Sequence, residues 1–162
     1  MGNKKLLLFL AMILPLCLIA QSDNDTIFKP VEYPEGFIAR LNVVYTKVGN
    51  WEGKMDLYLP PNTGKPVPII INIHGGGWNK GVKESQTGFT SFFKSGFAIA
   101  NIEYRLTGQA TAPAAIEDAR CALIYLIKNA DALNIDKNKI VIQGSSSGGH
   151  LALMAGLLGN NH

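Results

Sequence analysis

Cysteine is scarce in this sequence, and so is any excess of charge. Only two of the 162 residues are cysteines, Cys17 and Cys121. Cys17 lies in an N-terminal apolar stretch, so a chain without that stretch keeps one cysteine and can form no internal disulfide. The formal net charge of +3 falls to +1 without residues 1–20, which hold two lysines and no acid. A nearly neutral surface gives no electrostatic case for binding nucleic acid.

The sequence also lacks an apolar run long enough for a membrane span. Lys4 and Lys5 precede fifteen apolar residues from Leu6 to Ala20, whereas a transmembrane helix needs about 20. A basic start, a short apolar run and the polar segment QSDND after it are typical of a secretory signal peptide. We therefore predict cleavage after Ala20, a secreted or periplasmic protein and no stable membrane anchor. An uncleaved anchor is the alternative.

Internal repeats are absent, and the pattern after residue 36 alternates between strands and helices. Residues 1–20 are predicted to be the signal peptide, 21–36 an extended lead-in, and 37–162 one partial domain. Strands are predicted in a hairpin over 38–60, then at 69–73, 97–104 and 140–144, with helices near 85–96, 113–132 and 148–159. This order predicts an α/β fold, a mostly parallel sheet with an N-terminal antiparallel hairpin.

The helix that starts at Pro113 has its apolar residues at spacings of three and four. This amphipathic pattern places Glu117, Asp118 and Arg120 on the solvent side. The polar segment NIDKNK that follows it is predicted to be a connection rather than part of a strand.

Three consecutive serines lie between glycines near the C-terminus, in the segment QGSSSGGH. The pattern G-x-S-x-G fits one frame, from Gly144 to Gly148, and it selects Ser146. A buried strand before and a helix after are the context of a nucleophile elbow, where flanking side chains would collide with neighbouring elements. The alternative is a glycine-rich helix start without a catalytic role.

The segment HGGGW, residues 74–78, directly follows the predicted strand 69–73. Three successive glycines allow the backbone to approach a ligand and to turn its N–H groups inward. Such N–H groups stabilise the oxyanion that develops in acyl transfer. A plain tight turn is the alternative, whereas a phosphate-binding loop is excluded because neither of its glycine spacings is present.

Together these motifs resemble the α/β-hydrolase fold, and within it the carboxylesterases and lipases with an HGGG oxyanion loop. The segments DLYLP, IHGGGW, EYRLTGQATAPAAIEDARCAL and GSSSGGHLAL are similar to secreted bacterial esterases that remove acetyl or feruloyl groups from polysaccharides. The resemblance covers residues 38–160 and implies Ser146 as nucleophile. It also implies an oxyanion hole from the N–H groups of Gly76, Gly77 and Ser147, and no metal or other cofactor. His74, Gly75, Gly144 and Gly148 would support the two motifs.

The acid and the histidine of a catalytic triad should follow the serine in this family. Only 16 residues follow Ser146, and none of them is an acid. His150 lies one turn further along the same helix, His162 is the last residue, and His74 belongs to the oxyanion loop. We therefore expect this chain to be the N-terminal half of an esterase, truncated after the helix that follows the nucleophile. Its open sheet edge would favour self-association.

The sequence thus predicts a serine carboxylesterase that acts on small acyl esters, acetyl or feruloyl, on carbohydrate. One alternative is a non-catalytic binding domain or inactive remnant, which the missing acid and histidine favour. A second is a serine peptidase of the prolyl-oligopeptidase type, against which the HGGG loop argues.

Overall fold

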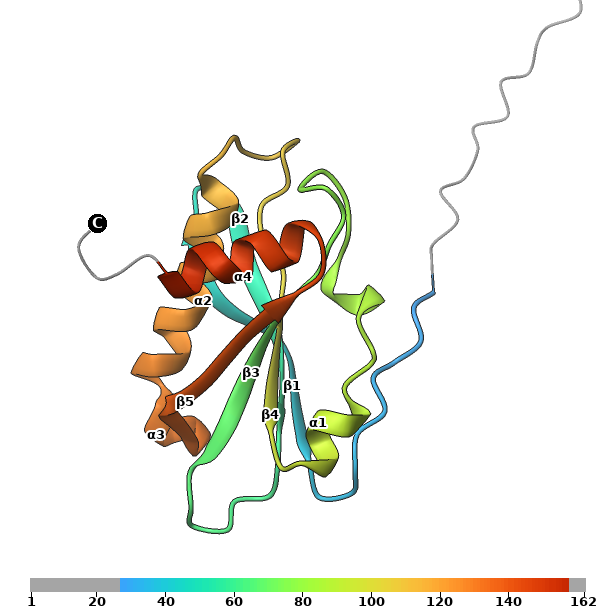
Figure 1. The fold of residues 1–162 in the computed structure, drawn as a ribbon, viewed down its shortest axis with the longest axis vertical. Coiled ribbons are helices and arrows are strands. Elements are labelled where there is room, and N and C mark those ends of the chain that lie inside the picture. The colour runs from blue at the N-terminus through green and yellow to red at the C-terminus, as the bar shows by residue number, and fades with distance from the viewer. Residues whose placement is uncertain (1–26, 158–162) are drawn as a thin grey trace, which may run out of the picture.

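The computed structural model describes residues 27–157, which form a five-stranded mixed sheet covered by helices on both faces (Figure 1). The strand order is β1-β2-β4-β3-β5. The parallel pairs join β4, β3 and β5, and the antiparallel pairs join β1, β2 and β4. The elements are β1 (Ile38–Val48), β2 (Trp51–Leu59), β3 (Val67–Ile73), η1 (Lys83–Ser85), α1 (Thr90–Lys94), β4 (Ala98–Ile102), α2 (Ala114–Lys128), α3 (Ala130–Leu133), β5 (Ile135–Gly144) and α4 (Ser147–Leu157).

The predicted hairpin is present as β1 and β2. Val48 pairs with Trp51, so the connection has only two residues, and Gly49 takes a φ of +57° in it. A two-residue hairpin turn requires such a positive φ, which glycine adopts without steric cost. The turn signal in the sequence therefore places this hairpin correctly.

The strand IIINI is buried on both faces, as its composition predicts. Ile69, Ile71 and Ile73 belong to the larger core, which packs against α2, α3 and α4. Ile70 belongs to a smaller core with Tyr58, Phe89, Phe93 and Ile99 on the other face, where α1 lies. Since successive side chains of a strand point to opposite faces, one apolar run supplies both cores.

Two expectations for the middle of the chain are wrong. The single long helix from Pro113 is divided: α2 ends at Lys128, and α3 follows after Asn129. The segment NIDKNK is not a connection, because β5 already begins at Ile135, although residues 137–139 are exposed.

The helical pattern also predicts the wrong position for Asp118. It is 1% exposed rather than on the solvent side. Its carboxylate accepts hydrogen bonds from Arg105 at three donors: the backbone N–H (2.8 Å), Nε (3.0 Å) and Nη2 (2.8 Å). A partner from a distant segment satisfies the charge, and a buried carboxylate needs such a partner.

The described part of the predicted lead-in, residues 27–36, contains no helix or strand. It runs beside the smaller core, where the ring of Tyr33 lies 5.5 Å from that of Tyr58. The predicted signal peptide, residues 1–20, lies outside the described residues. Within residues 27–157, no helix combines the length and the apolar character that a membrane crossing needs.

The loops that follow β3, β4 and β5 meet at one end of the sheet (Figure 1). These three strands are mutually parallel, so their carboxyl ends lie at the same edge. Ligand sites of α/β sheets lie at this edge. The HGGGW and GSSSG segments are two of the three loops there.

Candidate active site

Ser146 occupies the sharp turn between β5 and α4. It is exposed and has a φ of +51°, which places a serine in the left-handed region. Two backbone hydrogen bonds close the turn, from Gly148 N to Ser145 O (2.9 Å) and from His150 N to Ser146 O (3.1 Å). This strained strand-to-helix geometry is that of a nucleophile elbow, which presents the serine hydroxyl above the sheet.

The glycines on both sides of Ser146 are required by crowding. A Cβ on Gly144 would lie 2.4 Å from the backbone carbon of Gly148. A Cβ on Gly148 would lie 2.2 Å from the carbonyl oxygen of Ile73. Since both contacts are with backbone, which cannot move aside cheaply, the pattern G-x-S-x-G follows from the packing of the elbow against the end of β3.

The HGGGW segment lies directly against this elbow. A Cβ on Gly75 would lie 2.9 Å from the carbonyl oxygen of Ser145. Gly76 and Gly77 have φ values of +126° and +61°, and a Cβ on Gly76 would lie 2.0 Å from the carbonyl oxygen of Lys80. The loop therefore needs glycine for its conformation and for its approach to the residue before Ser146.

The N–H groups of Gly76 and Gly77 remain available as donors. Neither is the donor of a hydrogen bond among the turns and loops of residues 27–157. Ser147 is the first residue of α4, and the first N–H groups of a helix have no partner within the helix. These three N–H groups are those that the resemblance assigned to an oxyanion hole.

Tyr104, which the sequence did not single out as functional, joins the elbow to the HGGGW loop. Its ring stacks on that of His74, with centroids 4.4 Å apart. Its hydroxyl donates to the carbonyl of His74 (3.2 Å) and lies 3.4 Å from Oγ of Ser147. The Ser147 hydroxyl is thus buried against Tyr104. Burial raises the pKa of Tyr104, and the hydrogen bond with Ser147 opposes it, so this hydroxyl stays protonated.

His74 packs within its own loop. It is 2% exposed, and Nδ1 donates to the carbonyl of Gly75 at 2.8 Å. A Cβ on Gly81 would lie 2.5 Å from that same nitrogen, so the loop closes tightly on the ring. Burial lowers the pKa of His74, and the hydrogen bond to Gly75 opposes the shift only in part. A neutral, buried ring is consistent with a residue that supports the conformation of the HGGGW loop.

His150 lies on the first turns of α4 and faces Trp78. The two rings meet edge to face, with centroids 5.5 Å apart. Among residues 27–157, no histidine forms a hydrogen bond with Oγ of Ser146. His162 lies outside the described residues. The described part of the chain therefore holds the candidate nucleophile and the candidate oxyanion donors, but no histidine positioned as a base.

A cavity of about 410 Å³ lies beside His150 and Trp78. Trp78 is 40% exposed and holds a φ of +62°, and its carbonyl accepts a hydrogen bond from Thr107 N at 2.8 Å. The remaining wall comes from the loop between β4 and α2, from the start of α2 and from Leu151 of α4. Residues 27–157 contain no group of three or more metal-ligating side chains.

Comparisons with known proteins agree with this geometry. The BD-FAE family model matches residues 55–162. Carboxylesterase NlhH of Mycobacterium tuberculosis is 29% identical over 136 residues, which are 80% of this chain and 42% of that protein.

Two solved structures share the fold. A bacterial heroin esterase has 38% identity and a TM-score of 0.65, over 73% of this chain and 38% of that one. A truncated form of a carbohydrate esterase from gut microbiota has 32% identity and a TM-score of 0.65, over 76% and 44%. The chain spans less than half the length of each of these three proteins. By its motifs, its sheet and these matches, the chain belongs to the BD-FAE family and has the α/β-hydrolase fold of esterases.

Proposed function

We propose that this chain carries the nucleophile and the oxyanion hole of a serine carboxylesterase. One observation carries the proposal: Gly75 lies against Ser145, so the glycine loop adjoins the turn that holds Ser146. A domain used only for binding needs neither the strained serine nor the unpaired N–H groups. The esterase names of the related proteins support the same reaction.

The reaction would proceed through an acyl-enzyme. Oγ of Ser146 attacks the ester carbonyl carbon and passes its proton to a base, and the carbonyl oxygen becomes an oxyanion. The N–H groups of Gly76, Gly77 and Ser147 stabilise that oxyanion. Collapse of the tetrahedral intermediate breaks the bond to the alcohol, which leaves with the proton from the base. Water then attacks the acyl-serine and passes a proton to the base, and the second tetrahedral intermediate collapses to release the carboxylic acid while Oγ of Ser146 takes that proton back.

We further propose that the base and its acid come from sequence beyond His162. A serine without a positioned base is a poor nucleophile at neutral pH, and residues 27–157 supply none. Each protein compared above is more than twice as long as the matched part, which supports this assignment. The alternative of a non-catalytic binding domain has only the missing base in its favour.

For the substrate, we propose a small acyl ester, acetyl or feruloyl, on a carbohydrate. The likeness to a carbohydrate esterase supports the carbohydrate part. The cavity of about 410 Å³ beside Trp78 has room for a group larger than acetyl. Secretion through the predicted signal peptide would bring the enzyme to such polymers.

The test is ester hydrolysis by protein expressed from the complete gene. We expect hydrolysis of p-nitrophenyl acetate, and a loss of at least a thousandfold in kcat/KM in Ser146→Ala, since removal of the nucleophile leaves only residual catalysis. A fluorophosphonate should label wild type on the peptide with Ser146 and should leave Ser146→Ala unlabelled.

The matched control is Ser145→Ala, which removes the neighbouring exposed hydroxyl. Because the motif frame selects Ser146, this variant should keep its activity within a few fold and should still be labelled. Hydrolysis that survives in Ser146→Ala would refute the proposal. A protein that hydrolyses no ester and takes no label would instead be a binding domain.

A further inference from the structure

A row of polar side chains crosses four strands on the sheet face that carries α1. Asp56 pairs in register with Asn101, Asn101 with Asn72, and Asn72 with Gln143. The first three side chains are buried, at 6%, 1% and 6% exposed for Asp56, Asn101 and Asn72. Their neighbours two residues away in the same strands, Tyr58, Ile99 and Ile70, form the smaller apolar core. Burying polar side chains within an apolar sheet face costs free energy, so this row calls for a structural or functional explanation.

Hydrogen bonds connect the row from end to end. Gln143 Nε2 donates to Asn72 Oδ1 at 3.2 Å, and Asn72 Nδ2 donates to Asn101 Oδ1 at 3.0 Å. Asn101 Nδ2 then donates to the carbonyl of Lys83 at 2.7 Å. No buried side-chain nitrogen or oxygen within residues 27–157 lacks a partner. A fully satisfied polar network allows one arrangement and resists alternatives.

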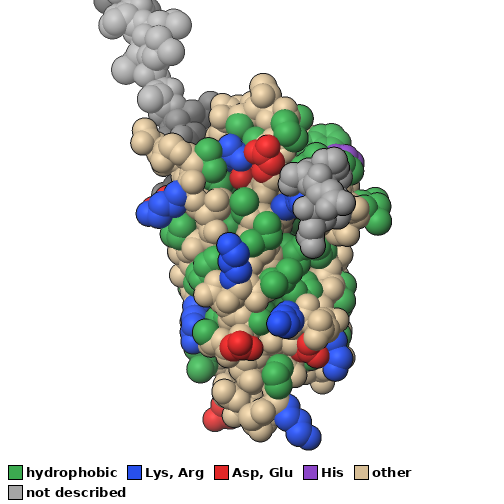
Figure 2. Space-filling model, turned by 90° about the vertical axis from the view of Figure 1, so that its left-hand side faces the viewer, with side chains coloured by type: hydrophobic (Ala, Val, Ile, Leu, Met, Phe, Trp, Pro, Cys, Tyr) green, Lys and Arg blue, Asp and Glu red, His purple; other side chains and the backbone are tan. Residues whose placement is uncertain are grey.

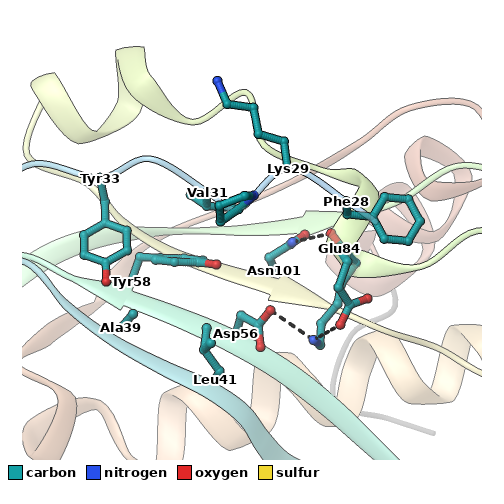
Figure 3. A pocket seen from close by; sticks show the side chains of 12 residues that line it. Phe28, Lys29, Val31, Tyr33, Ala39, Leu41, Asp56, Tyr58, Glu84 and Asn101 are labelled. Atoms are coloured by element: carbon teal, nitrogen blue, oxygen red, sulfur yellow. Dashed lines mark hydrogen bonds and ion pairs between the residues drawn. The ribbon is translucent and has the colours of Figure 1, made fainter. Parts of the chain in front are cut away.

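Lys83 closes the network at its other end. Its side chain is 1% exposed, and Nζ donates to Asp56 Oδ2 at 3.0 Å and to Glu84 (Figure 3). Asp56 Oδ1 in turn accepts the backbone N–H of Asn42 at 2.8 Å. Burial lowers the pKa of Lys83, but the bonds to Glu84 and Asp56 outweigh it and raise that pKa overall. The ammonium is therefore charged inside the sheet face.

The two ends of this network lie at the two halves of the active site. Lys83 begins η1 and marks the end of the segment 75–82, which follows β3 and contains the oxyanion glycines. Gln143 directly precedes Gly144, where the nucleophile elbow begins. His74 fixes the near end of the loop through its stack on Tyr104. The row thus links the far end of the loop to the strand that carries Ser146.

Stability alone gives no reason for this row. Replacing a buried ion pair by well-packed apolar side chains is often neutral or stabilising. On the basis of the function proposed above, we propose that Lys83 is a positioning residue, which holds the far end of the oxyanion loop in register with the elbow through Asp56 and Asn101.

The test is the double variant Lys83→Met/Asp56→Asn, in protein expressed from the complete gene. Asparagine keeps an acceptor for Asn42 N, and the double change leaves no unpaired buried charge. We expect kcat to fall roughly tenfold to a hundredfold with KM changed by less than about threefold, because oxyanion donors act mainly in the transition state. The control is Lys54→Met, which removes a lysine that is 39% exposed. It should leave kcat unchanged.

Hydrogen–deuterium exchange of residues 75–82 gives a readout independent of activity. Exchange should be faster in the double variant and unchanged in Lys54→Met, with both variants folded by circular dichroism. Unchanged exchange in the double variant would overturn the inference whatever the enzyme does. So would faster exchange with wild-type kcat. If Ser146→Ala keeps full activity, the proposed function fails, and the exchange result alone decides whether Lys83 holds the loop.

Discussion

Two of the four non-glycine residues with positive φ within residues 27–157, Ser146 and Trp78, lie at the candidate site. Both are non-glycine residues with positive φ, at +51° and +62°. A left-handed conformation costs an L-residue about 1–2 kcal/mol, so neighbours must hold each in place. The hydrogen bonds of His150 N and Thr107 N do so, each accepted by the strained residue's own carbonyl. Both strained residues are therefore held by hydrogen bonds of neighbouring segments, and both lie at the carboxyl end of the parallel strands.

His74 should make the stability of the fold fall in mild acid. Burial lowers its pKa in the folded state, and the hydrogen bond to Gly75 reduces that shift only in part. The unfolded chain has the ordinary histidine pKa of about 6.5, so it binds the proton more readily than the folded protein does. The stabilisation is complete above that pKa and is lost as the pH falls toward the lower, folded-state value.

Urea unfolding between pH 7.5 and 5 measures this effect. The free energy of unfolding should decrease toward acid in wild type more steeply than in His74→Phe, which keeps an aromatic ring against Tyr104. Equal slopes in the two proteins would show that His74 does not titrate differently on unfolding. The variant should be less stable at every pH, because the carbonyl of Gly75 loses its partner.

At the scale of elements, the ion pair of Arg105 with Asp118 fixes the connection between β4 and α2. Arg105 follows β4, and Asp118 lies on α2 with its side chain 1% exposed. Asp118→Ala should lower the free energy of unfolding by about 3–5 kcal/mol, since it leaves the guanidinium of Arg105, only 11% exposed, without its main partner. Chemical denaturation monitored by circular dichroism checks this.

The neighbouring acid on α2 provides the control. Glu117 also lies near Arg105, at 3.5 Å, but its side chain is 61% exposed. Glu117→Ala should therefore cost less than about 1 kcal/mol, as exposed ion pairs do. Equal losses in the two variants would mean that burial of the pair does not govern its contribution.

The same elements show what local sequence patterns could predict. The hairpin turn at Gly49, the doubly buried strand β3 and the serine elbow all depend on residues near one another in sequence, and all three were predictable. The burial of Asp118 depends on Arg105, thirteen positions away. The polar row depends on the strand order and on Lys83. The periodicity of apolar residues along a helix or strand does not indicate which distant residue will pair with a side chain, nor the order of the strands in the sheet.

The start of β5 was missed for a different reason. Residues 137–139 are exposed although they are extended. Their polar composition therefore follows from their exposure to solvent, and it cannot be told apart from the polar composition of a loop. Likewise, nothing in the spacing of Tyr104 indicates that its hydroxyl would meet Ser147. Contacts across the sheet end are set by tertiary packing.

On the scale of the whole molecule, one side of the sheet is open in the described residues. β5 is the last strand in the sheet order. Figure 2 faces the side toward which α4 ends in Figure 1, and hydrophobic side chains are spread over it between Lys and Arg residues. An apolar groove on β5, α2 and α4 is lined by Leu123, Ile140, Ile142, Ala152, Leu153, Gly156 and Leu157.

This open side predicts that the 162-residue chain on its own self-associates. Val141 on β5 is 47% exposed and Leu153 on α4 is 64% exposed, and an unpaired apolar edge strand is a template for another chain. Size-exclusion chromatography with light scattering should give a mass above that of the monomer, and Val141→Lys/Leu153→Lys should shift it toward the monomer. Ile124→Lys, on α2 and 45% exposed, should not. A wild-type chain that elutes as a stable monomer would show that the edge is protected without a partner.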